Sequence, residues 1–346
     1  MSNQYILRKC YYWIKKSSLV LMILFITIIT SCNRKPGMII GGGGREGEVV
    51  VVLNEEFKKG RAAEVIDEYL RDSYLLLPQH EPMFDIYYIP WAKFSDPFTG
   101  FRNIIKVDIN PKYTESKAAL QQYDRQVIVT MTAPNSEDFS DLFVKYAHQI
   151  VDALSMNEQR FMLEYAKHNV NKKLQQQILD NHQVNVLVPQ NYTIHKDTTN
   201  FVWMSLEAEK LSLGLILYYF DYTDKNQFQS EYLLHHRDSV LRKYIKGPLY
   251  PKRMSHMTTM REPVAPFVKE LNYNNNYMIE IKGLWRVTED FMAGPFLSVA
   301  KPDLDGKRIV VLEGYVYYPG ENKRKFMRRF EPIVYNFDFP KKETIK

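Results

Sequence analysis

The alternation of apolar and polar residues predicts several strands and one helix between residues 48 and 132. Residues 48–53, EVVVVL, are rich in β-branched side chains, which is typical of a strand buried on both faces. In residues 61–71, apolar positions recur at three- and four-residue spacing, which predicts a helix with one stripe facing the core. Shorter apolar runs predict further strands at residues 85–89, 103–109 and 126–132.

Two helical segments are predicted after these strands. Asn135 is placed to cap a helix whose apolar stripe runs from Phe139 to Leu154. Residues 155–157 interrupt the stripe, which predicts a bend there. A second helical stretch is expected to follow and to reach about Asp180.

The pattern returns to strands from Val184 onward, with a third helix among them. The apolar face of this helix runs from Phe228 to Ile245, and Gly247-Pro248 is a typical stop signal. Residues 213–220 are long and apolar enough to form a central strand. The other strands are predicted at residues 184–188, 201–206, 277–287, 296–299, 308–318 and 325–334.

These elements predict an α+β fold in which amphipathic helices pack on antiparallel β-sheets. Residues 48–182 and 183–340 each run through strands, a helix and more strands. This leaves open the interpretation that they are two similar halves, although no residue-level repeat supports a duplication.

The N-terminal segment has the composition of a lipoprotein signal peptide. Four basic residues lie among the first 16, residues 19–29 are apolar except for Thr27, and Ile-Thr-Ser precedes Cys32. A membrane span would need roughly 20 apolar residues, so a transmembrane anchor is the weaker alternative, and a plain secretory peptide is another. By resemblance to bacterial lipoproteins, we expect residues 1–31 to be removed and Cys32 to carry the lipid.

Residues 32–47 are expected to form a tether between the lipidated cysteine and the folded part. Four consecutive glycines make a regular element costly in backbone entropy. Residues 42–47 also match G-x-G-x-x-G, but this dinucleotide motif should follow a strand, and here it precedes one. We therefore interpret the match as part of the linker.

Charge and cysteine content argue against several classes of function. Removing the signal leaves 42 basic and 40 acidic residues, so the basic character lies largely in the signal and nucleic acid is not an expected partner. Cys10 lies in the signal, which leaves Cys32 without a disulfide partner. The eight histidines show no metal-binding spacing, and we expect neither a metal nor a cofactor.

Several strings in the chain together resemble one family. They are LPQHEPMF at residues 77–84, NFVW at 200–203, RDS at 237–239, KGP at 246–248, GLW at 283–285, FMAGPF at 291–296 and EGYVYYP at 313–319. The chain resembles the DUF4837 lipoprotein family of Bacteroidota over about residues 48–334. The resemblance implies an envelope lipoprotein of unassigned function and supplies no catalytic residues.

Two segments contain candidate residues for a ligand pocket. His80 and Glu81 lie between two prolines and could act as a general base and its orienting carboxylate, although a rigid turn explains them as well. Gly-Pro beside aromatic residues can shape a pocket floor, while large aromatic residues are also typical of a core. The pocket candidates of this second segment are Trp285, Met292, Gly294 and Phe296.

Three other motifs each have an ordinary structural interpretation. Residues 303–306, DLDG, resemble the start of a calcium loop but lack its terminal glutamate, so a hairpin turn is the better interpretation. Arg237-Asp238 lies on a predicted amphipathic helix and predicts a local or interhelical ion pair. The basic cluster at residues 323–329 could meet anionic lipid headgroups or envelope polymers, or could form a solvated strand face.

The sequence therefore predicts a lipid-anchored cell-envelope protein that acts as a non-enzymatic binding, assembly or structural module. The alternative is an envelope hydrolase for glycan or peptide, with a site assembled from separated carboxylates and His80. The expected partners are the membrane, through the anchor, and an envelope protein or glycan. Some lipoproteins are retained at the inner membrane by an aspartate directly after the lipidated cysteine. This chain has Asn33 at that position, which favours the outer membrane.

Overall fold

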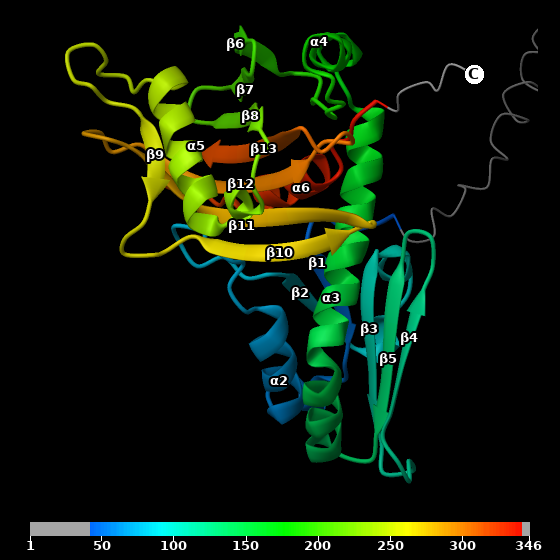
Figure 1. Cartoon of the computed structure of the whole chain (residues 1–346). Helices are drawn as coiled ribbons and strands as arrows, with labels where there is room; N and C mark the ends of the chain where they lie inside the picture. Colours follow the sequence, from blue (N-terminus) through cyan, green and yellow to red (C-terminus); the bar gives the residue numbers. More distant parts are fainter. Residues whose placement is uncertain (1–41, 341–346) are drawn as a thin grey trace, which may run out of the picture. The chain divides into compact units, whose positions relative to one another are not determined.

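The computed structural model describes residues 42–340, so the expected signal peptide and Cys32 lie outside the described residues. Figure 1 shows two sheets, with the long helix α3 running beside both. The helices are α2 (Arg61–Leu70), α3 (Ser136–His168), α4 (Lys172–His182), α5 (Ser230–Tyr244) and α6 (Arg324–Tyr335). The strands are β1 (Glu48–Val52), β2 (Asp85–Ile89), β3 (Asn103–Ile109), β4 (Lys117–Gln122), β5 (Val127–Ala133), β6 (Thr193–Thr198), β7 (Phe201–Glu207), β8 (Ser212–Asp221), β9 (Met257–Met260), β10 (Phe267–Tyr273), β11 (Asn276–Val287), β12 (Ala293–Pro302) and β13 (Arg308–Tyr317).

The smaller sheet has the strand order β2-β1-β3-β5-β4. Helices α2 and α3 cover one face, and residues 90–101 contribute apolar side chains to the other, so β1 is buried on both faces as predicted. The pairings β1–β2, β1–β3 and β3–β5 are parallel, and only β4 pairs antiparallel within this sheet. This differs from the antiparallel arrangement expected, because α2 carries the chain back along the sheet between β1 and β2.

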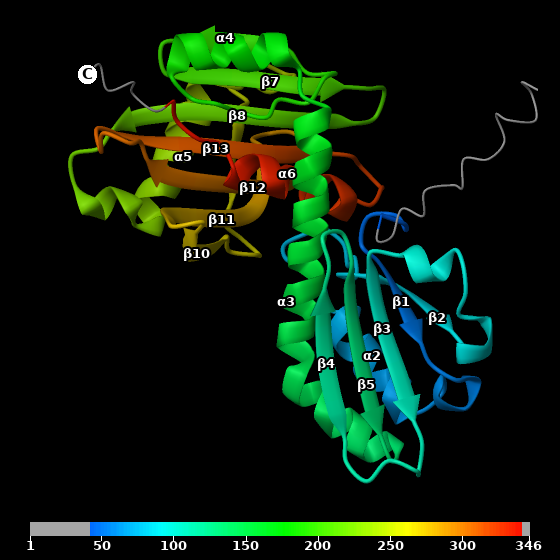
Figure 2. The ribbon, with the colours of Figure 1, turned by 90° about the vertical axis from the view of Figure 1, so that its right-hand side faces the viewer.

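The larger sheet is antiparallel throughout and has the order β10-β11-β12-β13-β8-β7-β6, with β9 paired to β11. Helix α5 covers one face and α6 the other, as the two views in Figures 1 and 2 show. Strand β8 lies between β13 and β7, the interior position predicted for it. The α+β class is confirmed, while the different topologies of the two sheets argue against two similar halves.

Helix α3 is one continuous helix of 33 residues, so the predicted bend at residues 155–157 is wrong. Its predicted cap is confirmed, since the Asn135 side chain accepts a hydrogen bond from the Asp138 backbone N–H at 2.9 Å. Asn157 and Glu158 interrupt the apolar stripe because they are buried hydrogen-bond partners of the smaller sheet. The helical break lies later, between His168 and the start of α4.

Two predicted strands are not strands. Residues 325–334 belong to helix α6, whose buried Phe326, Phe330 and Ile333 follow helical spacing. Residues 184–188 bury alternate valines in the core but make no ladder, and Asn185 forms only an isolated bridge with Asp338. The strands missed from the sequence, β4, β6, β9 and β10, are short or largely polar.

Lys301 in β12 is a cation buried within the core. Its ammonium donates to the carbonyl of Phe337 and lies 3.9 Å from that ring's centroid. Burial lowers the pKa of Lys301 to about 8, against an opposing effect of Asp338. A free lysine has a pKa of about 10.4, so between these values the unfolded chain binds more protons than the folded one.

We therefore expect the stability of the protein to rise, relative to Lys301→Met, as pH increases from 8 toward about 10.5. The relative change should be roughly 2 to 3 kcal/mol, because one pKa unit corresponds to about 1.4 kcal/mol. Chemical denaturation of both proteins across this range measures it. A difference in unfolding free energy that does not vary with pH would contradict the assignment.

Candidate functional site

An aromatic groove of about 430 Å³ lies beyond the C-terminal end of α5, on the face of the larger sheet that α5 covers. Strands β7, β8, β11 and β13 contribute its aromatic and polar walls, and the segment after α5 closes one side. Among the lining residues are Trp203, Glu207, Leu211, Pro248, Met257, Trp285, Met292, Tyr315 and Tyr317. A mainly apolar hollow of this size with a few polar groups suits a small ligand.

The floor of the groove is a cluster of buried rings. Trp285 and Tyr315 are nearly inaccessible to solvent and meet edge to face, with ring centroids 5.6 Å apart. Trp203 donates its indole N–H to the Tyr315 hydroxyl at 3.0 Å, and Tyr317 lies 6.1 Å from Trp285. Burial raises the pKa of Tyr315 to about 12, so its hydroxyl stays neutral at physiological pH.

Glycines in the sheet make room for these rings. A Cβ at Gly294 would lie 1.9 Å from the Val316 carbonyl oxygen and 3.1 Å from the Trp285 indole nitrogen. A Cβ at Gly214 would lie 1.9 Å from the Tyr315 ring. Both positions therefore require glycine, because any side chain would displace the groove floor or the neighbouring strand.

One wall of the groove is polar. Glu207 accepts hydrogen bonds from Ser212 at 2.7 Å and from Ser205. The Ser205 hydroxyl also lies 2.7 Å from His195 Nε2. Ser205 is completely buried, so it is not accessible as a nucleophile, while Glu207 is exposed and presents a carboxylate to the groove.

A buried ion pair fixes α5 beside the groove. Arg237 makes two hydrogen bonds of 2.7 Å to Glu313 on β13, and its guanidinium lies 3.7 Å from the centroid of the Phe296 ring. Arg237 also donates to Thr259, which donates in turn to Asp238. Burial alone lowers the pKa of Arg237, but the Glu313 carboxylate reverses this and raises it.

The structure brings together only part of the predicted pocket. Trp285 and Met292 line the groove, and Gly294 lies directly against the Trp285 ring. Phe296 is instead a core residue that packs against the Arg237 guanidinium. Its ring occupies the space above another glycine of β11, so it does not reach the groove.

His80 and Glu81 lie away from the groove and do not form a catalytic pair. His80 is exposed, and its Nδ1 lies 2.7 Å from the Ser73 hydroxyl. Glu81 is buried and accepts from the backbone N–H groups of Lys323 and Arg324, at 2.7 and 2.9 Å. The carboxylate therefore caps the start of α6, where the helix leaves backbone donors unpaired.

The basic cluster of α6 is largely committed to contacts within the chain. Arg324 pairs with Asp85, Arg328 donates to the Met83 carbonyl at 2.5 Å, and Arg329 pairs with Glu46 at 2.6 Å. Of these arginines only Arg329 is exposed. The cluster thus joins α6 to the loops of the smaller sheet, and it does not form a solvated strand face.

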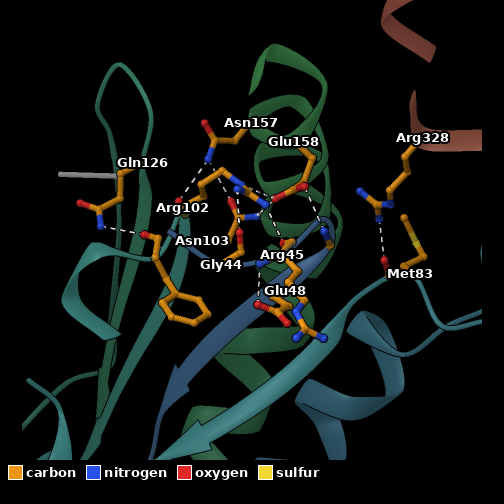
Figure 3. A network of polar contacts seen from close by, with 12 residues as sticks. Gly44, Arg45, Glu48, Met83, Arg102, Asn103, Gln126, Asn157, Glu158 and Arg328 are labelled. Atoms are coloured by element: carbon orange, nitrogen blue, oxygen red, sulfur yellow. Dashed lines mark hydrogen bonds and ion pairs between the residues drawn. The ribbon is translucent and has the colours of Figure 1, made fainter. Parts of the chain in front are cut away.

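A second polar network holds the expected tether's last residues against the smaller sheet (Figure 3). Glu158 of α3 accepts from Arg102 at 3.1 Å, from Asn103 at 2.8 Å and from the Gly47 backbone N–H at 3.0 Å. Arg102 in turn donates to the carbonyl groups of Gly44 and Arg45. Residues 42–47 are thus packed against the smaller sheet. The sequence predicted that they belong to the tether, and this part of the prediction is wrong.

The motif at residues 303–306 forms the turn between β12 and β13. Asp303 accepts from the backbone N–H groups of Lys307 and Arg308, and Gly306 has a positive φ of 63°. Within the described part of the chain, no group of three His, Cys, Asp or Glu side chains is arranged to hold a metal ion. Across residues 42–340, no helix combines the length and apolar character that a membrane span requires.

Trp203, Tyr315, Tyr317 and Glu207 are groove residues that sequence reasoning missed. The strings NFVW and EGYVYYP contain the three aromatic ones, yet neither string showed that they share a face. Alternation along each strand would have placed Trp203 and Ser205 on one side. Only the pairing of β8 with β13 on one side and with β7 on the other brings those residues together.

The fold and groove define an α+β protein with an aromatic ligand-sized site on an antiparallel sheet. Two family models match consecutive parts of the chain: DUF8532, a domain of unknown function, at residues 42–167, and DUF4837, also a domain of unknown function, at residues 171–336. Residues 171–336 therefore belong to the DUF4837 family, as the resemblance indicated. The string at residues 77–84 lies in the DUF8532 match, so the resemblance covers less of the chain than expected.

The comparison with known proteins does not assign a function to the chain. No curated protein matches the chain. Among solved structures, LpqN of Mycobacterium tuberculosis, described as involved in cell envelope biogenesis, is 11% identical, with a TM-score of 0.27 and coverage of 45% of this chain and 83% of its own. The human StarD13 lipid transfer and protein localization domain is 11% identical, with a TM-score of 0.22 and coverage of 47% and 95%. Both TM-scores are below 0.5, so neither likeness indicates a shared fold.

Proposed function

We propose that the protein is a lipid-anchored module of the cell envelope, held at the outer membrane through Cys32, that binds a glycan in the aromatic groove. The observation that carries the proposal is that the partly exposed rings of Trp203 and Tyr317 line the groove above the buried pair Trp285 and Tyr315, with the exposed carboxylate of Glu207 beside them. A sugar ring offers an apolar C–H face to aromatic side chains and hydroxyl groups to a carboxylate. The signal-like residues 1–32 support the envelope location.

A binding role fits the groove better than hydrolysis. The hydrolase alternative required His80 to converge with separated carboxylates, and His80 and Glu81 lie in other contacts. The Ser205 hydroxyl that joins His195 to Glu207 is buried. The buried Ser205 is therefore not available as a nucleophile, whereas the aromatic walls of the groove are available for recognition.

Replacing Tyr317 by Ala is expected to weaken glycan binding at least tenfold, which corresponds to about 1.4 kcal/mol, because it removes one aromatic wall and leaves the buried Trp285 and Tyr315 side chains in the chain. Titration with N-acetylglucosamine oligomers and with polysaccharide released from the envelope, followed by tryptophan fluorescence, measures the change. Trp203 and Trp285 lie in the groove and report on it directly.

Tyr277→Ala is the matched control for this experiment. Tyr277 is a partly exposed tyrosine of β11 that packs on Phe228 and does not line the groove. It should leave the affinity unchanged. Equal losses in both variants, or saturable binding that survives Tyr317→Ala intact, would rule out the groove as the glycan site.

A further inference from the structure

A separate apolar pocket of about 210 Å³ lies on the opposite face of the larger sheet, between α3, α6 and the start of β8. Tyr192, Phe330 and Ile333 form buried walls, and Leu206 and Leu213 are half-buried beside them. A cavity of about 150 Å³ lined by aliphatic and aromatic side chains is enough to hold benzene. The pocket is thus large enough for part of one aliphatic chain and too small for two.

This pocket adjoins a wide polar cleft of about 840 Å³. Met162, Tyr165 and Arg329 line both, so they mark the junction between the apolar and the polar compartment. Arg329 is partly exposed there and pairs with Glu46 at 2.6 Å. A ligand seated in the apolar pocket would therefore place its other end in the cleft.

Cations predominate among the exposed charged residues that line the cleft. Arg45 and Lys325 are exposed and make no ion pair with any residue in the described range. Its carboxylates are mostly engaged: Glu81 caps α6, Asp85 pairs with Arg324, Glu46 pairs with Arg329, and Glu48 accepts from the Tyr87 hydroxyl and the Arg45 backbone. The lining contains five basic and five acidic residues, but the exposed ones are Arg45, Lys325 and Arg329 against Glu321, so an incoming anion meets mainly cations.

We propose that these two compartments form a binding site for an anionic amphiphile with a single aliphatic chain. The chain lies among the apolar residues around Leu213, and the anionic group lies in the cleft near Arg329 and Lys325. A fatty acid and a lysophospholipid share this chemistry. The site is independent of the glycan groove, because the two lie on opposite faces of the sheet.

Isothermal titration of the chain from residue 32 onward, carrying Cys32→Ser, tests the proposal with dodecanoate. Every helix and strand that the structure describes begins after Gly41, so removing residues 1–31 takes away none of them. The serine prevents acylation, so no lipid of the protein's own competes. We expect saturable binding of one dodecanoate per chain. A second arm with lauroyl lysophosphatidylglycerol identifies which headgroup is preferred, and tighter binding of either supports the proposal.

Leu213→Trp should reduce dodecanoate affinity at least tenfold by filling the pocket. Leu271→Trp is the matched control, since Leu271 is a half-buried leucine that packs against the same core cluster but does not line the pocket. If Leu213→Trp does not fold, Arg329→Gln should lower dodecanoate affinity several-fold and leave neutral dodecyl maltoside unaffected. The proposal is overturned if the Cys32→Ser chain binds neither dodecanoate nor the lysophospholipid, or if the folded variants bind the preferred one as tightly as the parent chain.

Discussion

Replacing Arg237 by Met should lower the free energy of unfolding by about 3–5 kcal/mol, the usual cost of removing one partner from a buried ion pair. Arg237 and Glu313 are both almost fully buried, and the two hydrogen bonds between them are each 2.7 Å. Without the guanidinium, the Glu313 carboxylate would remain in the core without a counter-charge. Burial already raises the pKa of Glu313 against the opposing effect of Arg237, and this opposition would be lost.

Equilibrium denaturation of the variant measures this effect, and two further variants test its cause. Arg237→Met combined with Glu313→Leu should recover much of the lost stability, because an apolar pair of similar size can replace a buried ion pair. Arg261→Met is the surface control. Arg261 pairs with Glu231 and Asp238 but is partly exposed, so its loss should cost about 1 kcal/mol or less. A double variant no more stable than Arg237→Met would show that the charge is not the cause.

The second large effect is expected for Glu158→Ala, which should destabilise the protein by about 3–5 kcal/mol. Figure 3 shows Glu158 at the centre of its network. Its removal leaves the Arg102 guanidinium without its ion-pair partner, and leaves the Asn103 amide and the Gly47 backbone N–H without their carboxylate acceptor. Buried donors without acceptors are costly because they have lost water as well.

Glu164→Ala on the same helix provides the control, since Glu164 is exposed and forms a surface ion pair with Lys167 one turn later. It should cost about 0.5 kcal/mol or less. Hydrogen exchange adds a second measurement: in Glu158→Ala the Gly47 amide should lose protection, while the α2 amides keep theirs. Equal destabilisation by the two alanine variants would mean that the network contributes little.

The local pattern of apolar residues was sufficient to predict the helices and strands in which buried side chains recur at regular spacing. Strands β2 and β3 match the predicted bounds, α2 differs by one residue, and the cap at Asn135 is as expected. Each follows from periodic apolar residues or from a capping side chain a few positions away. The same reasoning failed for α6, where buried arginines among apolar residues concealed a helical stripe.

The candidate site was less predictable because its residues come from distant segments. Trp285 and Met292 were named from an unusual local composition, but Trp203 and Tyr317 join them only when β7, β8, β11 and β13 pair in register. Glu81 had the right chemistry for a catalytic carboxylate. Its contact with the α6 backbone, more than 240 positions away, gives it a structural role.

The sequence by itself determined the α+β class, most of the strands and helices, and the family of residues 171–336, because apolar periodicity and characteristic strings are properties of neighbouring residues. Only the tertiary structure decided the parallel order of the smaller sheet, the pairing of Arg237 with Glu313 and of Arg102 with Glu158, and the two pockets on opposite faces of the larger sheet. These features depend on contacts between segments far apart in the chain. The partner of a buried charged residue can be identified only once the fold has brought the two residues together.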